Sequence, residues 1–187
     1  MHTPFKVNDI RTSPFIFTAQ VVCIQETGFT QSASDEQLRM DFQVEGYSLS
    51  LLGRGRGKGI ATYFKEGFVC SAQYETDNWF ILKVTSSDTD VINVYRQSTD
   101  SLRSNFLSTL MSLINATKKT FIVGDFNLDY NTKPEPPISS VLRSLGFDQL
   151  VLAPTHSEGG LIDHVYCNNS GDITVVQECH YFTDHDV

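Results

Sequence analysis

The sequence predicts an α+β fold in which a mixed β-sheet arrangement is covered by helices. Apolar runs rich in β-branched residues recur along the chain, two segments carry apolar residues at helical spacing, and no linker-like break separates them. The 187 residues, of which 40% are hydrophobic and 19% charged, suffice for one sizeable core and are few for two. We therefore expect a single globular domain over residues 1–187.

Seven apolar segments are expected to form strands. Two of them, at 79–84 and 90–95, flank the turn-forming sequence TSSDT and are expected to pair as an antiparallel hairpin. The others lie at 20–25, 59–64, 121–125, 161–167 and 172–177.

Two further segments are expected to form amphipathic helices. The first has Asp100 or Ser101 available as its N-cap. The second, residues 137–145, ends before Gly146, at the position where a C′ glycine belongs. The apolar faces consist of Leu102, Phe106, Leu110, Leu113 and Ile114 in the first helix, and of Ile138, Val141, Leu142 and Leu145 in the second.

Composition restricts the class of protein. No apolar run approaches the roughly 18 residues needed to span a bilayer, and residues 1–20 lack the features of a signal peptide. The net charge of -8 argues against a passive nucleic-acid binder, but not against a metal enzyme, because acids around a divalent cation can still present a positive site to phosphate.

The four cysteines have no C-x-x-C spacing, so we expect an intracellular protein, nuclear if it meets DNA there, with reduced thiols at Cys23, Cys70, Cys167 and Cys179.

Polar residues follow or interrupt several predicted strands. Strand ends meet at the edge of a sheet, so carboxylates from remote segments can converge there on one point. Hard divalent cations such as Mg²⁺ take oxygen ligands, whereas the His and Cys spacings typical of a zinc site are missing. A single Asp after a strand is more often a turn residue, but four such endings favour a site: Glu26, Asp125, Asp163 with His164, and Asp184 with His185.

These residues resemble the endonuclease/exonuclease/phosphatase superfamily, which includes AP-endonuclease-like, DNase I-like and retrotransposon endonuclease domains. VCIQET is similar to the family's glutamate motif, VINVYR to its tyrosine strand and FIVGDFNLD to its G-D-x-N motif. LIDHVYC is similar to the I-D-H/Y strand and YFTDHDV to the terminal S/T-D-H motif. The matches follow family order, and PTHSEGGLIDHVYCN and GKGIATYF look closest to endonuclease domains of mobile elements.

The resemblance implies a four-layer sandwich, with two mixed sheets packed face to face and helices outside. It also implies a Mg²⁺-dependent DNA endonuclease that attacks the phosphate backbone with water. Glu26 would hold Mg²⁺, or Mn²⁺ in its place, with Asp184 nearby or acting through water. The alternatives are a phosphatase or phosphodiesterase of the same superfamily, acting on a phosphoinositide or another phospho-ester, and an inactive fragment of the fold.

The resemblance also implies roles for five catalytic residues. Asp125 would orient or deprotonate the attacking water, and Asn127 would donate to the phosphate or position that water. His185 would contact the phosphate or act as an acid or base, with Asp163 fixing its tautomer and orientation. Tyr95 would point its hydroxyl at the phosphate, although it could equally close a strand with its ring in the core.

The chain departs from the family pattern at its N-terminus. The family's domain opens with a central strand that carries an Asn well before the glutamate. Only 25 residues precede Glu26, and Asn8 is too close to it to be an easy substitute. We therefore expect a domain truncated at its N-terminus that lacks the first strand.

Other polar residues are expected to lie outside the catalytic set. His164 is expected to pack under the site, His156 to belong to a loop and Asp129 to form a turn. The sequence GRGRGKG at 53–59 does not match a phosphate-binding P-loop. Its cations favour either a contact with the DNA backbone or a solvated turn, and they are Arg54, Arg56 and Lys58.

Overall fold

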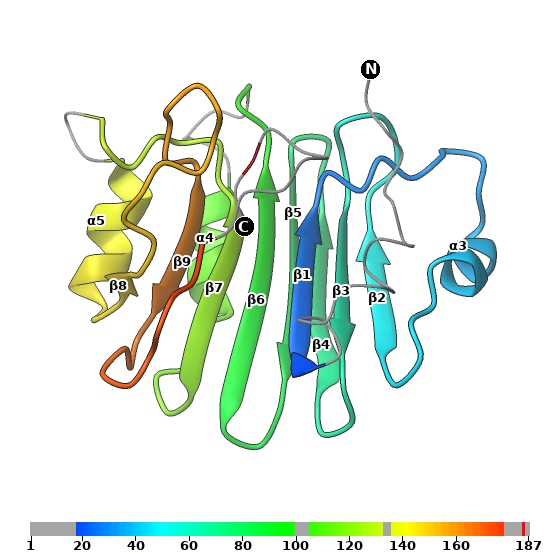
Figure 1. Cartoon of the computed structure of the whole chain (residues 1–187), viewed down its shortest axis with the longest axis horizontal. Coiled ribbons are helices and arrows are strands. Elements are labelled where there is room, and N and C mark those ends of the chain that lie inside the picture. The colour runs from blue at the N-terminus through cyan, green and yellow to red at the C-terminus, as the bar shows by residue number, and fades with distance from the viewer. Residues whose placement is uncertain (1–17, 100–104, 133–135, 178–184, 186–187) are drawn as a thin grey trace.

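The computed structural model describes residues 18–99, 105–132, 136–177 and 185, which form two β-sheets packed face to face (Figure 1). The smaller sheet is antiparallel and has the order β1 (Val21–Gln25), β3 (Ile60–Phe64), β2 (Ser48–Leu52). The larger sheet is mixed, because β6 and β7 run parallel. Its order is β4 (Val69–Glu75), β5 (Trp79–Thr85), β6 (Thr89–Arg96), β7 (Lys119–Asp125), β9 (Asp163–Cys167) and β8 (Asp148–Gln149).

Helices cover the outer faces of both sheets. Helices α4 (Phe106–Ser112) and α5 (Pro137–Ser144) pack on the six-stranded sheet, and α3 (Asp35–Asp41) packs on the smaller sheet. Figure 1 shows α5 and α3 at opposite ends of the long axis of the molecule. The predicted sandwich of two sheets with helices outside is therefore confirmed.

Alternation of side chains along the strands divides the core into layers. On β6, Ile92 and Val94 face the helices, whereas Val91 and Tyr95 face the smaller sheet. Asn93 also faces the smaller sheet, where it is fully buried and polar. Its amide donates to Ala61 O and Thr62 Oγ1, both at 3.0 Å, and its Oδ1 accepts from Gln25 at 2.6 Å. These bonds join the two sheets through otherwise apolar packing.

Most predicted strands and the hairpin are confirmed, with one exception. Strands β5 and β6 pair antiparallel from Trp79–Arg96 to Thr85–Asp90. The segment 172–177 is not a strand, so that prediction is wrong. Its residue pattern suits a half-buried sheet surface, but Val176 is 70% exposed, and the Gln177 side chain instead donates to Pro154 O at 2.6 Å.

The predicted helices exist but have different limits. Helix α4 begins after Asn105, which occupies its N-cap position; the expected caps Asp100 and Ser101, and Leu102, lie outside the described ranges. Leu113 and Ile114 follow the helix but still pack against its core cluster.

The end of α5 is as predicted. Gly146 has φ 82° and donates to Arg143 O, while Phe147 donates to Leu142 O, both at 3.0 Å, which is the bonding of a Schellman motif. Leu145 was expected in the apolar face of this helix but is 52% exposed.

Three cysteines within the described ranges, Cys23, Cys70 and Cys167, are free thiols, as predicted, whereas Cys179 lies outside them.

Among the helices that the structure describes, none has the length and apolar character required to cross a bilayer.

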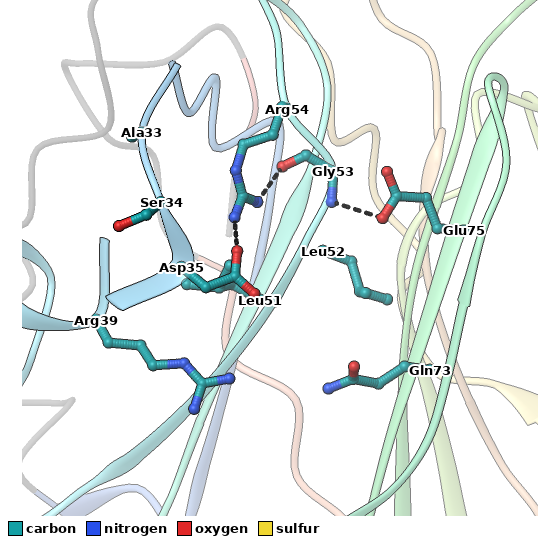
Figure 2. Close-up of a pocket in the computed structure, with 10 residues that line it drawn as sticks. All are labelled: Ala33, Ser34, Asp35, Arg39, Leu51, Leu52, Gly53, Arg54, Gln73 and Glu75. Atoms are coloured by element: carbon teal, nitrogen blue, oxygen red, sulfur yellow. Dashed lines mark hydrogen bonds and ion pairs between the residues drawn. The ribbon is translucent and has the colours of Figure 1, made fainter. Parts of the chain in front are cut away.

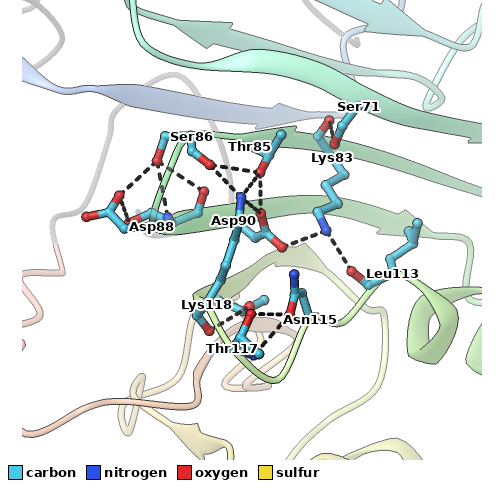
Figure 3. A network of polar contacts seen from close by, with 12 residues as sticks. Ser71, Lys83, Thr85, Ser86, Asp88, Asp90, Leu113, Asn115, Thr117 and Lys118 are labelled. Atoms are coloured by element: carbon cyan, nitrogen blue, oxygen red, sulfur yellow. Dashed lines mark hydrogen bonds and ion pairs between the residues drawn. The ribbon is translucent and has the colours of Figure 1, made fainter.

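A buried ion pair stabilises the start of β6. Asp90 is 1% exposed, and its carboxylate lies 2.6 Å from Lys83 Nζ and 3.7 Å from Lys118 Nζ (Figure 3). The Thr85 hydroxyl donates to Asp90 at 2.5 Å, and Lys83 also donates to Leu113 O at 2.8 Å. These bonds hold the β5–β6 turn against the segments that follow α4 and precede β7.

We predict that Asp90→Ala lowers the free energy of unfolding by about 3 kcal/mol, because it leaves two partly buried ammonium groups without their carboxylate. Urea denaturation of both proteins measures this loss. Asp88→Ala is the control, since that carboxylate is solvent-exposed two residues away and should matter far less. Equal losses in the two variants would contradict a special role for the buried pair.

Candidate active site

Three strands of the six-stranded sheet place polar side chains in one row. Tyr95 on β6 is in register with Asp125 on β7, and Asp125 is in register with Asp163 on β9. Neighbours in register point to the same face of a sheet. Because Tyr95 packs in the cluster between the sheets, the row lies on the face toward the smaller sheet.

Gly124 permits β6 and β7 to approach each other just before this row. A Cβ on Gly124 would lie 1.9 Å from Val94 O, and its φ of 146° is one that L side chains rarely adopt. The glycine before Asp125 is therefore a steric requirement of the sheet.

Asn127 holds the carboxylate of Asp125. Its backbone N–H donates to Asp125 Oδ1 at 2.8 Å, and its side-chain amide donates to Oδ2 at 3.0 Å and to Arg96 O at 2.8 Å. Both amide hydrogens are thus used within the protein. This geometry gives Asn127 a positioning role, and its donation to a phosphate stays a prediction.

The environment of Asp125 favours its protonated form. Burial, with only 3% of the residue exposed, raises the pKa of Asp125 from 3.8 to about 7, and the negative charge of Asp163 adds to the shift. The hydrogen bond from Asn127 and the proximity of His185 act in the opposite direction. A carboxyl group with a pKa near neutrality is suited to proton transfer.

Asp163 orients the imidazole of His185. Nδ1 of His185 lies 2.8 Å from Asp163 Oδ2, and since a carboxylate only accepts, Nδ1 carries the hydrogen. Proton transfer to other groups is then left to Nε2. The His156 ring packs edge-to-face on His185, with centroids 5.0 Å apart, and the two residues form an isolated β-bridge. The loop residue His156 therefore touches the candidate site.

Glu26 reaches the row from the smaller sheet. It directly follows β1, has φ 51° and accepts from the Tyr95 hydroxyl at 2.8 Å. The same hydroxyl lies 2.8 Å from Gly57 O. Burial, followed by the contact with Glu26, raises the pKa of Tyr95, so the hydroxyl stays protonated and can donate. Glu26 and Tyr95 thus connect the two sheets at the site.

The structure gathers every predicted site residue that it describes. Within the described ranges, one group could hold a metal ion through ligand atoms within 4.8 Å of one another: Asp125, Asp163 and His185. Glu26, Tyr95 and Asn127 contact or neighbour this group. Asp184 lies outside the described residues. The individual catalytic roles stay predictions.

His164 is fully buried and lies next to the site, in the position expected for a structural residue. Its Nε2 lies 2.9 Å from Leu128 O and 3.1 Å from Leu161 O, so this nitrogen carries the hydrogen, and Nδ1 accepts from the Tyr166 hydroxyl at 3.0 Å. Burial lowers the pKa of His164, which keeps the ring neutral. Asp129 accepts from Asn131 N at 3.1 Å, the turn bond expected for it.

Sequence reasoning missed two residues that support the site. Arg96, which ends β6, is 2% exposed and donates to Phe126 O at 3.1 Å. Thr155 Oγ1 accepts from Ile162 N and Asp163 N at 3.1 and 3.0 Å and so fixes the start of β9. The signal for Arg96 was a cation directly after an apolar strand, whereas nothing in the pattern around Thr155 distinguished it from other loop residues.

The sequence profile described as "Endonuclease/Exonuclease/phosphatase family" matches residues 9–185. The chain belongs to this family. Members of the endonuclease/exonuclease/phosphatase family are phosphodiesterases and nucleases, which supports a hydrolase activity. A comparison with curated proteins finds no match.

Solved structures share the fold of this family member. The endonuclease domain of TRAS1, a telomere-specific non-LTR retrotransposon, superposes with a TM-score of 0.67 at 14% identity, over 99% of this chain and 90% of that one. The 3′ phosphatase NExo from Neisseria, bound to product DNA hairpin, gives 0.66 at 16% identity, over 96% and 89%. An AP endonuclease from Archaeoglobus fulgidus gives 0.55 at 15% identity, over 81% and 77%. The DNase I-like fold and the resemblance to retrotransposon endonucleases are confirmed.

We predict that this endonuclease/exonuclease/phosphatase family member loses stability relative to its Asp125→Asn variant as the pH rises from about 4 to about 8. The folded protein keeps a proton on Asp125 between pH 3.8 and about 7, where the unfolded chain has released it, so raising the pH favours unfolding. Urea denaturation in EDTA at several pH values measures the difference.

Asp163→Asn tests the cause of this shift. Removing the neighbouring negative charge should reduce the pH dependence of the stability without abolishing it, because burial is the larger cause. A stability difference between Asp125→Asn and the unmodified protein that is the same at every pH would contradict the shift.

Proposed function

We propose that the protein is a Mg²⁺-dependent DNA endonuclease that cleaves by attack of water on a backbone phosphate. The observation that carries this proposal is the convergence of Asp125, Asp163 and His185, with ligand atoms within 4.8 Å, next to the Glu26–Tyr95 contact. Phosphodiester hydrolysis needs a proton acceptor for water, donors toward the phosphate and compensation of negative charge. The site provides candidates for each.

The donor set fits a hard divalent cation, and Glu26 is the best candidate to hold it. Glu26 is exposed, and Tyr95 binds only its Oε1, so Oε2 makes no hydrogen bond with the residues that the structure describes. Asp125 and Asp163 already accept hydrogen bonds from Asn127 and His185. Carboxylate oxygens with water and phosphate suit Mg²⁺ or Mn²⁺, and Asp184 would be the second ligand. When bound, the metal would neutralise phosphate charge and stabilise the leaving oxygen.

Side chains of the protein would activate the water, bind the phosphate and transfer protons. Asp125 would orient the attacking water and take its proton, which a pKa of about 7 allows at neutral pH. Asp163 binds Nδ1 of His185, and Nε2 would contact the phosphate or transfer a proton. The Tyr95 hydroxyl has a single hydrogen, which lies toward Glu26 or Gly57 O in this structure, and it would turn that hydrogen to the phosphate when substrate binds.

DNA as substrate is supported by the kinds of relatives, which include a retrotransposon endonuclease domain and a phosphatase bound to a DNA hairpin. One of these structures, NExo, is a 3′ phosphatase, so the experiments must separate phosphodiester from phosphomonoester substrates. We place the activity in a single domain spanning residues 1–187, and an intracellular, nuclear location would bring it to DNA.

We predict that the protein nicks supercoiled plasmid with Mg²⁺ and that Asp125→Asn or His185→Ala reduces the rate by about 10²- to 10⁴-fold, the contribution typical of a general acid or base. Agarose electrophoresis of nicked and closed plasmid measures the rate. Asp129→Asn is the matched control, because the new side chain keeps the Oδ1 acceptor of that turn and should leave the rate unchanged.

Two results would contradict the endonuclease. One is nicking that survives Asp125→Asn and His185→Ala equally, which would indicate a contaminating nuclease. The other is an intact plasmid together with phosphate release from a 3′-phosphorylated oligonucleotide or a phosphoinositide, which would make the protein a phosphatase.

We also predict that Tyr95→Phe reduces kcat for nicking by about 10²-fold, because one preorganised donor is lost. The ring would still pack against Phe80, so the variant should stay folded, with a melting temperature lowered only by the loss of the bonds to Glu26 and Gly57 O. Nicking kinetics and thermal unfolding of the same preparation test both statements. An unchanged kcat would leave Tyr95 as a residue that merely closes its strand.

A further inference from the structure

The glycine-rich loop of residues 53–59 is folded against the candidate site. Tyr95 bonds the Gly57 carbonyl at 2.8 Å, and Gly55 N donates to Phe29 O at 2.8 Å. Gly28 N and Thr27 N donate to the carbonyls of Lys58 and Gly59 at 2.9 and 3.2 Å. The loop is therefore held by the segment that follows Glu26, and it is not a freely solvated turn. Positive φ angles make this path possible at Gly53, Gly55, Gly57 and Gly59.

Two of the three cations in this loop have structural partners. Arg54 forms an ion pair with Asp35 and donates to Gly53 O at 2.8 Å. Figure 2 shows this guanidinium directed at Asp35. Both residues line a hollow of about 360 Å³ between α3 and strands β2 and β4. Lys58 Nζ donates to Asp77 O at 2.8 Å. Arg54 and Lys58 thus hold the loop to its surroundings.

Arg56 differs from its two neighbours. It is exposed and makes no hydrogen bond or ion pair with any residue that the structure describes. Gly55 and Gly57 on either side of it are both bonded to other segments, so its backbone is fixed one residue from the Tyr95 contact. The protein therefore presents an uncommitted guanidinium beside the candidate site.

A cation at this position offsets part of the negative charge around the candidate site. The chain carries a net charge of -8, and Glu26, Asp125 and Asp163 add carboxylates where the substrate phosphate would bind. A polyanionic substrate would be repelled by this surface unless cations compensate. A guanidinium can bind a phosphate through two parallel hydrogen bonds, which fixes position as well as charge.

We propose that Arg56 binds a backbone phosphate of a polymeric nucleic acid, adjacent to the phosphate that is cleaved. This deepens the proposed function and rests on it, because it assigns the same site a polymer as substrate. Arg56 acts in substrate binding, whereas Arg54 and Lys58 fix the loop. A small phospho-ester that occupies only the catalytic residues does not reach Arg56.

The test measures binding separately from catalysis. Affinity of the whole protein for a fluorescent DNA duplex is measured at several NaCl concentrations in EDTA. Arg56→Gln should weaken binding and reduce the slope of log K against log salt by about 0.9, the effect of one phosphate contact. Arg56→Lys should restore most of the slope, since it restores the charge. Lys119→Gln is the matched control, because it removes a charge at the opposite end of β7 from Asp125 and should leave the slope unchanged.

Activity provides the second readout. Arg56→Gln should reduce kcat/KM for plasmid nicking and leave hydrolysis of bis(p-nitrophenyl) phosphate unchanged. An unchanged salt slope, or an equal loss on the small diester, would overturn the inference. A protein that cleaves no substrate would overturn the proposed function instead, and that result comes from the nicking assay of the unmodified protein. Arg54→Gln should lower the melting temperature, whereas Arg56→Gln should not; the reverse would show that the two roles are wrongly assigned.

Discussion

The register of β6, β7 and β9 is the constraint on which the candidate site depends. It sets Tyr95, Asp125 and Asp163 side by side on the face between the sheets. A shift of one residue in any of these strands would turn its polar side chain toward the helices, because side chains alternate between the faces. Gly124 makes the register possible by letting Val94 O approach where any side chain would collide. The site is therefore built into the pairing of the sheet and does not rely on loops alone.

The second sheet completes the site and is attached by polar contacts near it. Asn93 and Gln25 bond across the interface between the sheets. Asn93 lies two residues before Tyr95, and Gln25 lies one residue before Glu26. Because Asn93 is fully buried, its bond to Gln25 is costly to break, and the two sheets have little freedom to slide. The distance between the Glu26 carboxylate and the Asp125–Asp163–His185 group is consequently fixed by the sandwich.

Much of this arrangement could be predicted from sequence because it depends on residue patterns within single segments of the chain. An apolar run ending in Asp125 identified β7, and a run interrupted by Asp163 and His164 identified β9. The family motifs identified Glu26, Asp125, Asp163 and His185 as partners. Strands β2, β4 and β8 were missed. Strand β4 is an exposed edge strand with polar residues, β8 has only two residues, and β2 is a short strand that alternates serine and leucine. The segment 172–177 has strand-forming residues but no sheet to complete among the described strands. Propensity describes a residue's fit to a sheet, whereas pairing depends on long-range contacts that one sequence does not display.

The contacts of the glycine-rich loop were also beyond sequence reasoning. The pattern identified a cluster of cations, but not that Arg54 and Lys58 would be used internally while Arg56 would not. Such assignments depend on Asp35 and Asp77, which come from segments outside the loop.

The left-handed backbone at Glu26 and Asn127 has a consequence for how this fold can change. These are the non-glycine residues with positive φ in the part of the chain that the structure describes, at 51° and 48°, and both belong to the candidate site. Such conformations cost roughly 1 to 3 kcal/mol for residues with a side chain. Glycine at either position would relieve this conformational free-energy cost, but it would also remove the Glu26 carboxylate or the Asn127 amide. At these two positions, then, the substitution that would stabilise the backbone is also the one that would remove a side chain of the candidate site.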